Sequence, residues 1–353
     1  MKILILPGDA IGPEITAVTR QALQALDAKF DLKLELVERD IGLAAYEKTG
    51  RTMPDDVMDE IRATPFTVLG PVSTMDYPPE DEGGVNPSKA VRTNLDLYAN
   101  IRPSRTRAGV PSVARDMDLI VVRENTEGFY ADRNMFAGNG EFMPTPDTAM
   151  SMRKITAAGC RRIARTAFEL ARTRRKKLTA VHKGNVMRMT DGLFLREVRA
   201  VAKDFPDVEV DDVIVDAMAA LLVRRPESFD VVVTTNMFGD ILSDEAAELA
   251  GGLGLGGSIN ASETQAVAQA AHGSAPDIAG QNKANPTAHL ISAQLLLKWH
   301  ADRSGNNQLA SAAAHLEAAL DNVLADPANH TPDLGGTVGT REFGDRLAKA
   351  VSG

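Results

Sequence analysis

Two aspartates in the stretch 231–244 are spaced so that they could share a metal ion. Asp240 and Asp244 lie at the start of an apolar pattern with helical period, so both carboxylates should project from one face of a helix. Their like charges repel each other, and a hard cation such as Mg²⁺ or Mn²⁺ would turn that repulsion into binding. The alternative is structural: Asp240 would cap the helix and Asp244 would favour its positive end.

A third carboxylate, Asp216, follows the apolar stretch 213–215. Taken alone, it is typical of a helix cap. Mg²⁺ is commonly held by a few carboxylates, with substrate oxygens and water completing its shell. Asp216, Asp240 and Asp244 are therefore a candidate metal set.

Three arginines could bind an anionic substrate. Arg92 lies near the end of a predicted helix, Arg102 in a turn that leads into a strand, and Arg123 directly after a strand. Each alone is typical of a surface residue. As a trio they suit a carboxylate substrate, because a planar guanidinium binds a carboxylate through two parallel hydrogen bonds. Tyr130 and Lys183 are candidate proton-transfer groups, with packing and solvation as their alternative roles.

A short loop at 272–280 could approach a nucleotide closely. It reads His-Gly-Ser-Ala-Pro-Asp-Ile-Ala-Gly and is followed by Asn285 and Pro286; an ordinary surface loop is the alternative. A literal G-x-G-x-x-G also occurs at 252–257, but a helix is predicted before it. Because the Rossmann fingerprint needs a strand before it and a helix after it, we do not interpret this match as a dinucleotide site.

The composition describes a globular protein large enough for two lobes. Of its 353 residues, 44% are hydrophobic and 25% are charged. The net charge of −9 argues against a nucleic-acid partner, because binding phosphates requires a basic surface. The one cysteine, Cys160, excludes an intrachain disulfide and fits a reducing cytoplasm. Since no apolar run is long enough to span a membrane, we expect a soluble, cytoplasmic protein.

The residues that could carry chemistry lie on a chain in which strands and helices alternate. Strands are predicted at 2–6, 34–37, 66–69, 119–122, 178–182, 213–215 and 231–233, and Gly239 is expected to end the last of them. Helices are predicted at 13–26, 54–62, 89–98, 156–172, 192–202, 217–224, 286–299 and 310–324. This alternation predicts an α/β fold with a parallel sheet. The stretch 131–148 has no helical period, which indicates an arm or hairpin, and the polar loop 75–87 is expected to cover a site.

At these residues the sequence resembles the β-decarboxylating dehydrogenases, the family of isocitrate, homoisocitrate, isopropylmalate and tartrate dehydrogenases. The similarity covers nearly the whole chain. It rests on the motifs Pro7-Gly-Asp-Ala-Ile-Gly-Pro, Leu97-Tyr-Ala-Asn-Ile-Arg-Pro, Arg123-Glu-Asn-Thr-Glu-Gly, His182-Lys-Gly-Asn, Asn236-Met-Phe-Gly-Asp-Ile-Leu-Ser-Asp and His272-Gly-Ser-Ala-Pro-Asp-Ile-Ala-Gly. The resemblance implies two lobes around a mostly parallel sheet without a Rossmann fingerprint. Residues 1–99 and 250–353 would form the cofactor-binding lobe, and 100–249 a central lobe with an arm near 128–150 that clasps a second subunit.

The resemblance also implies which residues bind the substrate and move its protons. Arg92, Arg102 and Arg123 would hold the carboxylates of a malate, with Tyr130 beside them. In the family reaction Lys183 assists removal of the hydroxyl proton while hydride passes to the nicotinamide. CO₂ then leaves, and Tyr130 protonates the enolate.

Two subunits would complete each site by the same resemblance. Asp240 and Asp244 of one subunit and Asp216 of its partner would hold Mg²⁺ or Mn²⁺. Lys183 and Asn185, also from the partner, would face the metal. We therefore expect a homodimer with shared active sites.

The resemblance identifies the cofactor as NAD. Family members that use NAD carry an acidic and then an aliphatic residue where NADP users carry lysine and tyrosine. Here these positions are Asp277 and Ile278, which suit the two ribose hydroxyls. The expected cofactor-binding residues are Thr74, His272, Gly273, Ser274, Ala275, Asp277, Ile278 and Asn285.

By the same resemblance, the residues six and four before Arg92 would contact the group at C3, and here they are Asn86 and Ser88. Polar residues suit a carboxylate at C3, whereas a leucine-rich surface suits an isopropyl group. Isocitrate-type enzymes carry the same two residue types in reverse order. Wider motifs favour isocitrate or homoisocitrate, with 3-isopropylmalate, tartrate or D-malate as alternatives. The chain departs from the family at Gln269, where glutamate is usual, and Leu69 stands where some isocitrate enzymes have lysine. The loop 76–84 is longer and more acidic than suits a substrate with a γ-carboxylate.

A regulatory subunit that keeps the fold without catalysis is the alternative from another class of protein. Such chains lose their catalytic ligands. This one retains the arginines, Tyr130, Lys183 and all three aspartates, so we expect an enzyme.

Overall fold

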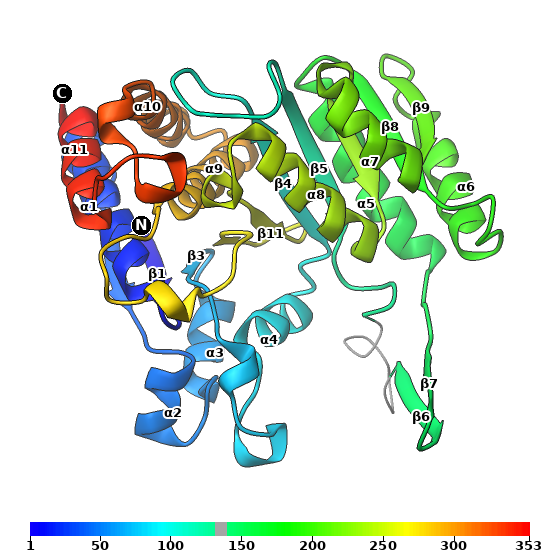
Figure 1. Ribbon diagram of the computed structural model, residues 1–353, viewed down its shortest axis with the longest axis horizontal. Coiled ribbons are helices and arrows are strands. Elements are labelled where there is room, and N and C mark those ends of the chain that lie inside the picture. The colour runs from blue at the N-terminus through cyan, green and yellow to red at the C-terminus, as the bar shows by residue number, and fades with distance from the viewer. Residues whose placement is uncertain (131–139) are drawn as a thin grey trace.

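One large sheet forms the centre of the molecule (Figure 1). The computed structural model describes residues 1–130 and 140–353. Within these residues ten strands pair in the order β2-β1-β3-β12-β11-β4-β5-β10-β8-β9. Their bounds are β1 (Lys2–Leu6), β2 (Glu35–Glu38), β3 (Phe66–Leu69), β4 (Ala99–Arg105), β5 (Asp118–Glu124), β8 (Lys177–His182), β9 (Glu209–Ile214), β10 (Val231–Thr234), β11 (Ile259–Ala261) and β12 (Ala266–Gln269).

The sheet is mixed, with its antiparallel pairs at the centre. β4 runs antiparallel to both of its neighbours, β11 and β5, and β11 runs antiparallel to β12. The remaining pairs of this sheet are parallel, which confirms the expected mostly parallel arrangement. β4 therefore joins the two parallel halves, and it carries Arg102.

Helices cover both faces of the sheet. Ile3 and Ile5 of β1 pack in an apolar cluster with α1, α9, α10 and α11, whereas Leu4 and Leu6 pack with α3 and α4 on the opposite face. This alternation is that of a strand buried on both sides. None of the helices in the described part of the chain has the length and apolar character needed to cross a bilayer. Their bounds are α1 (Gly12–Phe30), α2 (Leu43–Thr49), α3 (Asp55–Ala63), α4 (Pro87–Asn94), α5 (Ala157–Arg172), α6 (Thr190–Ala202), α7 (Val215–Arg224), α8 (Asn236–Ala250), α9 (Thr287–Ser304), α10 (Asn307–Leu324) and α11 (Thr340–Ser352).

Two predicted boundaries near the site are wrong. α4 ends at Asn94 instead of continuing to residue 98, because Asp96 adopts a positive φ of 46° and the chain turns into β4. β10 ends at Thr234 and α8 begins at Asn236, so Gly239 lies inside this helix and is not the residue that ends the strand. The N-cap of α8 is Thr235, which rules out the alternative that Asp240 caps the helix.

The predicted arm contains a hairpin that projects from the body of the molecule (Figure 1). Its strands are β6 (Glu141–Thr145) and β7 (Thr148–Ser151), which form a separate antiparallel sheet. All residues of both strands are exposed. The middle of the expected arm, 131–139, lies outside the described residues.

Candidate active site

Two buried arginines converge on the aspartates of α8. Arg102 on β4 donates from Nη1 to Asp244 Oδ1 at 2.8 Å and lies, through Nη2, 3.2 Å from Asp240 Oδ1. Arg123 at the end of β5 also pairs with Asp240 and donates to Asn236 Oδ1 at 2.7 and 2.9 Å. The structure therefore joins two of the three predicted substrate arginines to two of the three predicted metal ligands.

Gly239 makes this convergence possible. A Cβ atom at this position would lie 2.6 and 2.7 Å from the side-chain carbons of Arg123. Any larger residue would therefore push the guanidinium away from Asn236 and Asp240. The glycine that was predicted to end the strand instead provides space for Arg123, one of the predicted substrate arginines.

The neighbouring charges of this cluster shift the pKa of Asp244 in opposite directions. Burial raises the pKa of its carboxyl group above the ordinary value, and the nearby charge of Asp240 raises it further. The guanidinium of Arg102 lowers the same pKa. Two carboxylates and two guanidinium groups share the site, so their formal charges balance.

The third aspartate lies in a different part of the chain. Asp216 is the second residue of α7, and its ion pair with Lys183 lowers the pKa of its carboxyl group. Asn185, two residues after Lys183 in the sequence, is exposed to solvent. In the described residues no group of three His, Cys, Asp or Glu side chains could hold a metal, so one chain does not gather Asp216 with Asp240 and Asp244.

The loop after β5 is anchored by its two glutamates and carries Tyr130. Glu124 accepts hydrogen bonds from the backbone of Thr126 and Glu127, and Glu127 accepts one from the backbone of Thr156. These bonds fix the loop between β5 and α5. The Tyr130 ring lies near Arg123, with 5.9 Å between its centroid and the guanidinium carbon.

The expected substrate residues of α4 meet Gln269 of β12. Ser88 Oγ accepts a hydrogen bond from Gln269 Nε2 at 2.6 Å, and Arg92 Nη2 lies 3.5 Å from Gln269 Oε1. Ser88 and Arg92 are four residues apart, so they share one face of the helix. Asn86 is the N-cap of α4, where its side-chain oxygen accepts from the backbone of Lys89 at 3.0 Å.

The predicted nucleotide loop lines a pocket of about 390 Å³. Asn285 Nδ2 donates to Asp333 Oδ2 at 2.9 Å at its edge. Ser274 lies beside the pocket, where its hydroxyl accepts a hydrogen bond from Ser73 Oγ at 2.8 Å. Thr74, the other expected cofactor residue, directly follows Ser73 in the sequence. Asp277 is exposed on the same loop and directly precedes Ile278, which lines the pocket. The lining residues are Ile11, Gly254, His272, Gly273, Ala275, Ile278, Lys283, Ala284, Asn285 and Asp333.

Two features of this pocket fit a nucleotide. His272 Nε2 is buried without a hydrogen-bond partner among the described residues, and burial lowers the pKa of the ring, which keeps it neutral. A Cβ at Gly254 would lie 2.5 Å from Asp333 and 2.9 Å from Asn285, so glycine keeps the wall open. The 252–257 stretch lies between α8 and β11, which confirms that it is no Rossmann fingerprint.

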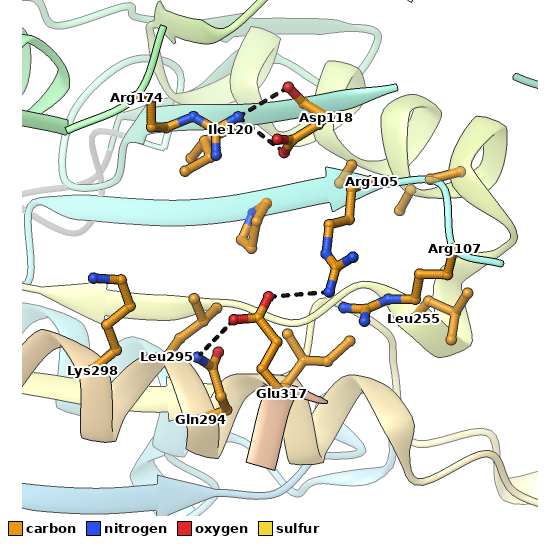
Figure 2. Close-up of a pocket in the computed structure, with 15 residues that line it drawn as sticks. Arg105, Arg107, Asp118, Ile120, Arg174, Leu255, Gln294, Leu295, Lys298 and Glu317 are labelled. Atoms are coloured by element: carbon orange, nitrogen blue, oxygen red, sulfur yellow. Dashed lines mark hydrogen bonds and ion pairs between the residues drawn. The ribbon is translucent and has the colours of Figure 1, made fainter. Parts of the chain in front are cut away.

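A second cavity, of about 200 Å³, lies among β4, β5, α8, α9 and α10 (Figure 2). None of the predicted site residues lines it. Two ion pairs join charged residues of its lining: Arg105 lies 3.1 Å from Glu317, and Arg174 lies 2.9 Å from Asp118 (Figure 2). The predicted site residues lie instead in the α8 cluster and around the nucleotide-loop pocket, which together form the candidate active site.

Several polar residues of the site were missed by the sequence reasoning. Asn236 and Asn100 bond Arg123 and Arg102, although both occur in motifs where they were given no role. Asn260 is fully buried in β11. A polar residue within an apolar strand is the signal that could have identified Asn260.

Comparisons with known proteins agree with this geometry. Residues 2–347 match the family described as isocitrate/isopropylmalate dehydrogenase. The chain is 41% identical to a 3-isopropylmalate dehydrogenase of Methanothermobacter thermautotrophicus and 41% identical to an isocitrate/homoisocitrate dehydrogenase of Thermus thermophilus, each time over 99% of this chain and 98% of the relative. Its fold superposes on the crystal structure of isocitrate dehydrogenase from Methylococcus capsulatus with a TM-score of 0.88 and 38% identity, covering 100% and 99% of the two chains. The predicted resemblance is confirmed, and the chain belongs to the isocitrate/isopropylmalate dehydrogenase family of oxidatively decarboxylating enzymes.

Proposed function

We propose that this enzyme oxidatively decarboxylates a 3-substituted malate to a 2-oxo acid with NAD and Mg²⁺ or Mn²⁺. The observation that carries the proposal is the contact of buried Arg102 and Arg123 with Asp240 and Asp244. A divalent cation on the aspartates and a dicarboxylate on the arginines would preserve the charge balance of this cluster. Family members typically use NAD and a divalent metal.

Asp240 and Asp244 would hold the metal together with Asp216 of the partner subunit. Three carboxylates per site are hard oxygen donors, which fit Mg²⁺ or Mn²⁺ better than a softer metal. When bound, such an ion supplies Lewis-acid polarisation of a carbonyl oxygen. Arg92, Arg102 and Arg123 would orient the carboxylates of the substrate.

Lys183 and Tyr130 would move the protons. Lys183 is paired with Asp216, so the two would reach the neighbouring site together. There the lysine, with Asn185 beside it, would assist removal of the hydroxyl proton, and Tyr130 would return a proton to the product carbon.

The pocket formed by the nucleotide loop would bind NAD. His272 offers an uncommitted ring nitrogen, and Gly273 and Ala275 let the backbone approach the cofactor. Asp277 would accept hydrogen bonds from the ribose hydroxyls and repel the 2′-phosphate of NADP.

The favoured substrate is isocitrate or homoisocitrate. Polar Asn86 and Ser88 support this choice, as does the name of the Thermus thermophilus relative. 3-Isopropylmalate is a second candidate, because the Methanothermobacter thermautotrophicus relative carries that name.

The projecting hairpin supports a homodimer. Its exposed side chains include Phe142, Met143 and Met150, which a second copy of the chain would cover.

Cys160 is buried, with the pKa of its thiol raised to about 12 by burial, and a single unreactive thiol fits the cytoplasm.

A substrate panel tests the proposal. Isocitrate, homoisocitrate, 3-isopropylmalate, D-malate and tartrate are compared by kcat/KM with NAD and Mn²⁺. Turnover of at least one malate that disappears with a chelator and returns with Mn²⁺ is expected. Failure of a folded, dimeric preparation to act on any of them would overturn the proposed reaction.

A further inference from the structure

A buried aspartate lies behind the turn that carries Lys183. Asp191 is the second residue of α6, and its side chain is fully buried. Its Oδ2 accepts a hydrogen bond from the backbone N–H of Lys183 at 2.5 Å. The carbonyl oxygen of Lys183 accepts from the backbone of Val186 and Met187 at 3.0 and 2.9 Å. Both backbone polar groups of the lysine are therefore fixed, and its side chain extends from this turn to Asp216.

The other carboxylate oxygen of Asp191 pairs with Arg153, whose side chain is only 7% exposed. Arg153 Nη1 also donates to Thr190 Oγ1 at 2.9 Å, and Nη2 donates to Thr235 Oγ1 at 2.9 Å. Thr190 is the first residue of α6, and Thr235 is the N-cap of α8. One guanidinium group thus joins the starts of two helices.

Arg153 lies in the segment that returns from the projecting hairpin to α5 (Figure 1). The next residue, Lys154, exchanges two backbone hydrogen bonds with Gly128, at 2.8 and 3.0 Å. The chain is therefore paired with itself where it leaves for the arm and where it returns. The guanidinium carbon of Arg153 lies 5.8 Å from the ring centroid of Phe129 and 5.3 Å from that of Phe238 on α8. The base of the arm, the start of α8 and the turn before α6 meet at this arginine.

Net stability is a poor explanation for the Arg153–Asp191 pair. A buried ion pair is commonly no more stable than apolar side chains of the same volume, because both charges lose their hydration. What the carboxylate supplies is two oxygens that only accept, and each is used by a different donor. Neither an apolar side chain nor an amide, which has one oxygen, would provide the same two acceptors. The pair is therefore suited to placing the groups that it bonds.

We propose that Asp191 is a positioning residue that holds Lys183 in place for proton removal, and that Arg153 fixes Asp191 from the base of the arm. The inference rests on the proposed function and adds two positioning residues to that site. Since Lys183 would serve the active site of the partner, the pair acts on that site as well. It does not act on the site that contains Asp240 of its own chain.

The experiment uses the full-length dimer with Asp191→Asn and with the double change Asp191→Leu and Arg153→Met. The amide of Asp191→Asn has one oxygen for two donors, so the Lys183 N–H or the guanidinium loses its acceptor. The double variant leaves no buried charge unpaired, so it remains decisive if Asp191→Asn does not fold. Glu197→Gln is the matched control, because it makes the acid-to-amide change at another buried carboxylate of α6, which pairs with Arg161.

Two readouts are compared in these dimers. With NAD and Mn²⁺, kcat should fall about ten- to a hundredfold in both Asp191 variants, because a displacement of about 1 Å can cost that much. KM for the malate and for NAD should change less than about threefold, because Lys183 acts in the transition state. Hydrogen–deuterium exchange at residues 183–187, which needs no turnover, should become faster, because the Lys183 N–H has lost its acceptor. Glu197→Gln should leave kcat and exchange unchanged.

Mixed dimers test which active site the aspartate serves. Chains with different affinity tags are combined, and the heterodimers are isolated. Asp191→Asn paired with Asp240→Asn should show about half of the wild-type activity, because one of the two sites then contains neither change. Asp191→Asn paired with Asp216→Asn should gain nothing, because each site then contains one change. A chain that is merely destabilised would gain equally from both partners.

The outcomes separate this inference from the proposed reaction. Wild-type kcat in both Asp191 variants, unchanged exchange at 183–187, or equal gains in the two pairings overturns the inference and leaves the reaction standing. Asp216→Asn paired with Asp240→Asn checks the shared site itself; if that pairing gains nothing, the kcat and exchange of the homodimers decide the inference. Absence of turnover by the wild type with every malate refutes the reaction.

Discussion

Replacing Asp240 with asparagine separates two roles of one carboxylate, as partner of two arginines and as proposed metal ligand. The change is nearly isosteric. Asp240 Oδ1 lies 3.2 Å from Arg102 Nη2 and also pairs with Arg123, and an amide oxygen could still accept from both. What the variant loses is the negative charge.

The structure predicts a small effect on stability and a large one on activity. The Asp240 side chain is 36% exposed, so its ion pairs are screened, and we expect a loss of about 1 kcal/mol instead of the 3–5 kcal/mol typical of a fully buried pair. Lewis-acid stabilisation is worth several kcal/mol, and each 1.4 kcal/mol is tenfold in rate, so kcat/KM should fall by roughly 10³-fold or more.

Three measurements check this prediction. NADH formation gives kcat/KM, calorimetric titration gives the affinity for Mn²⁺, and thermal unfolding gives the stability. Glu245→Gln is the control, because it makes the same carboxylate-to-amide change at the residue after Asp244 on α8. Full activity of Asp240→Asn with unchanged Mn²⁺ affinity would refute the assignment of Asp240 as a ligand.

Three further predictions follow from other parts of the molecule. Asp277 should make kcat/KM at least about 10²-fold higher with NAD than with NADP, because like charges placed side by side cost several kcal/mol and its carboxylate opposes the 2′-phosphate. Asp277→Lys combined with Ile278→Tyr should narrow this ratio, and equal use of both cofactors by the wild type would contradict the prediction. Burial lowers the pKa of His289 to about 3 and that of His300 to about 4, whereas the unfolded histidines titrate near 6.5. As the pH falls, the unfolded state therefore binds protons before the folded state does. The free energy of unfolding is then highest above pH 6.5, and below pH 6.5 it should fall by up to about 1.4 kcal/mol per pH unit for each histidine. A urea midpoint that does not change between pH 7 and pH 5 would argue against this, and His289→Gln should reduce the dependence of the midpoint on pH. Replacing residues 141–151 with a short Gly-Ser linker should yield an inactive monomer by sedimentation, and an active monomer would disprove the shared site.

Local features of the chain were predictable where the pattern was strong. β1 and β3 begin and end where the apolar runs predicted, and α5 begins after Thr156, whose side chain accepts from the backbone of Gly159. Helix ends near the site were less predictable. The end of α4 depends on how Leu97 and Tyr98 enter β4, which is a tertiary contact and leaves no mark in the helical period.

The sequence by itself determined the alternation of strands and helices, the family motifs and the residue types of the site, because these depend on neighbours within a few positions. Only the tertiary structure decided which of those residues meet. Arg102 reaches Asp244 across 142 positions, and Gln269 reaches Ser88 across 181, since the sheet order brings β4, β11 and β12 together at its centre. The direction of a buried hydrogen bond likewise depends on its partner, so the side-chain oxygen of Asn100 accepts because Arg102 Nε can only donate.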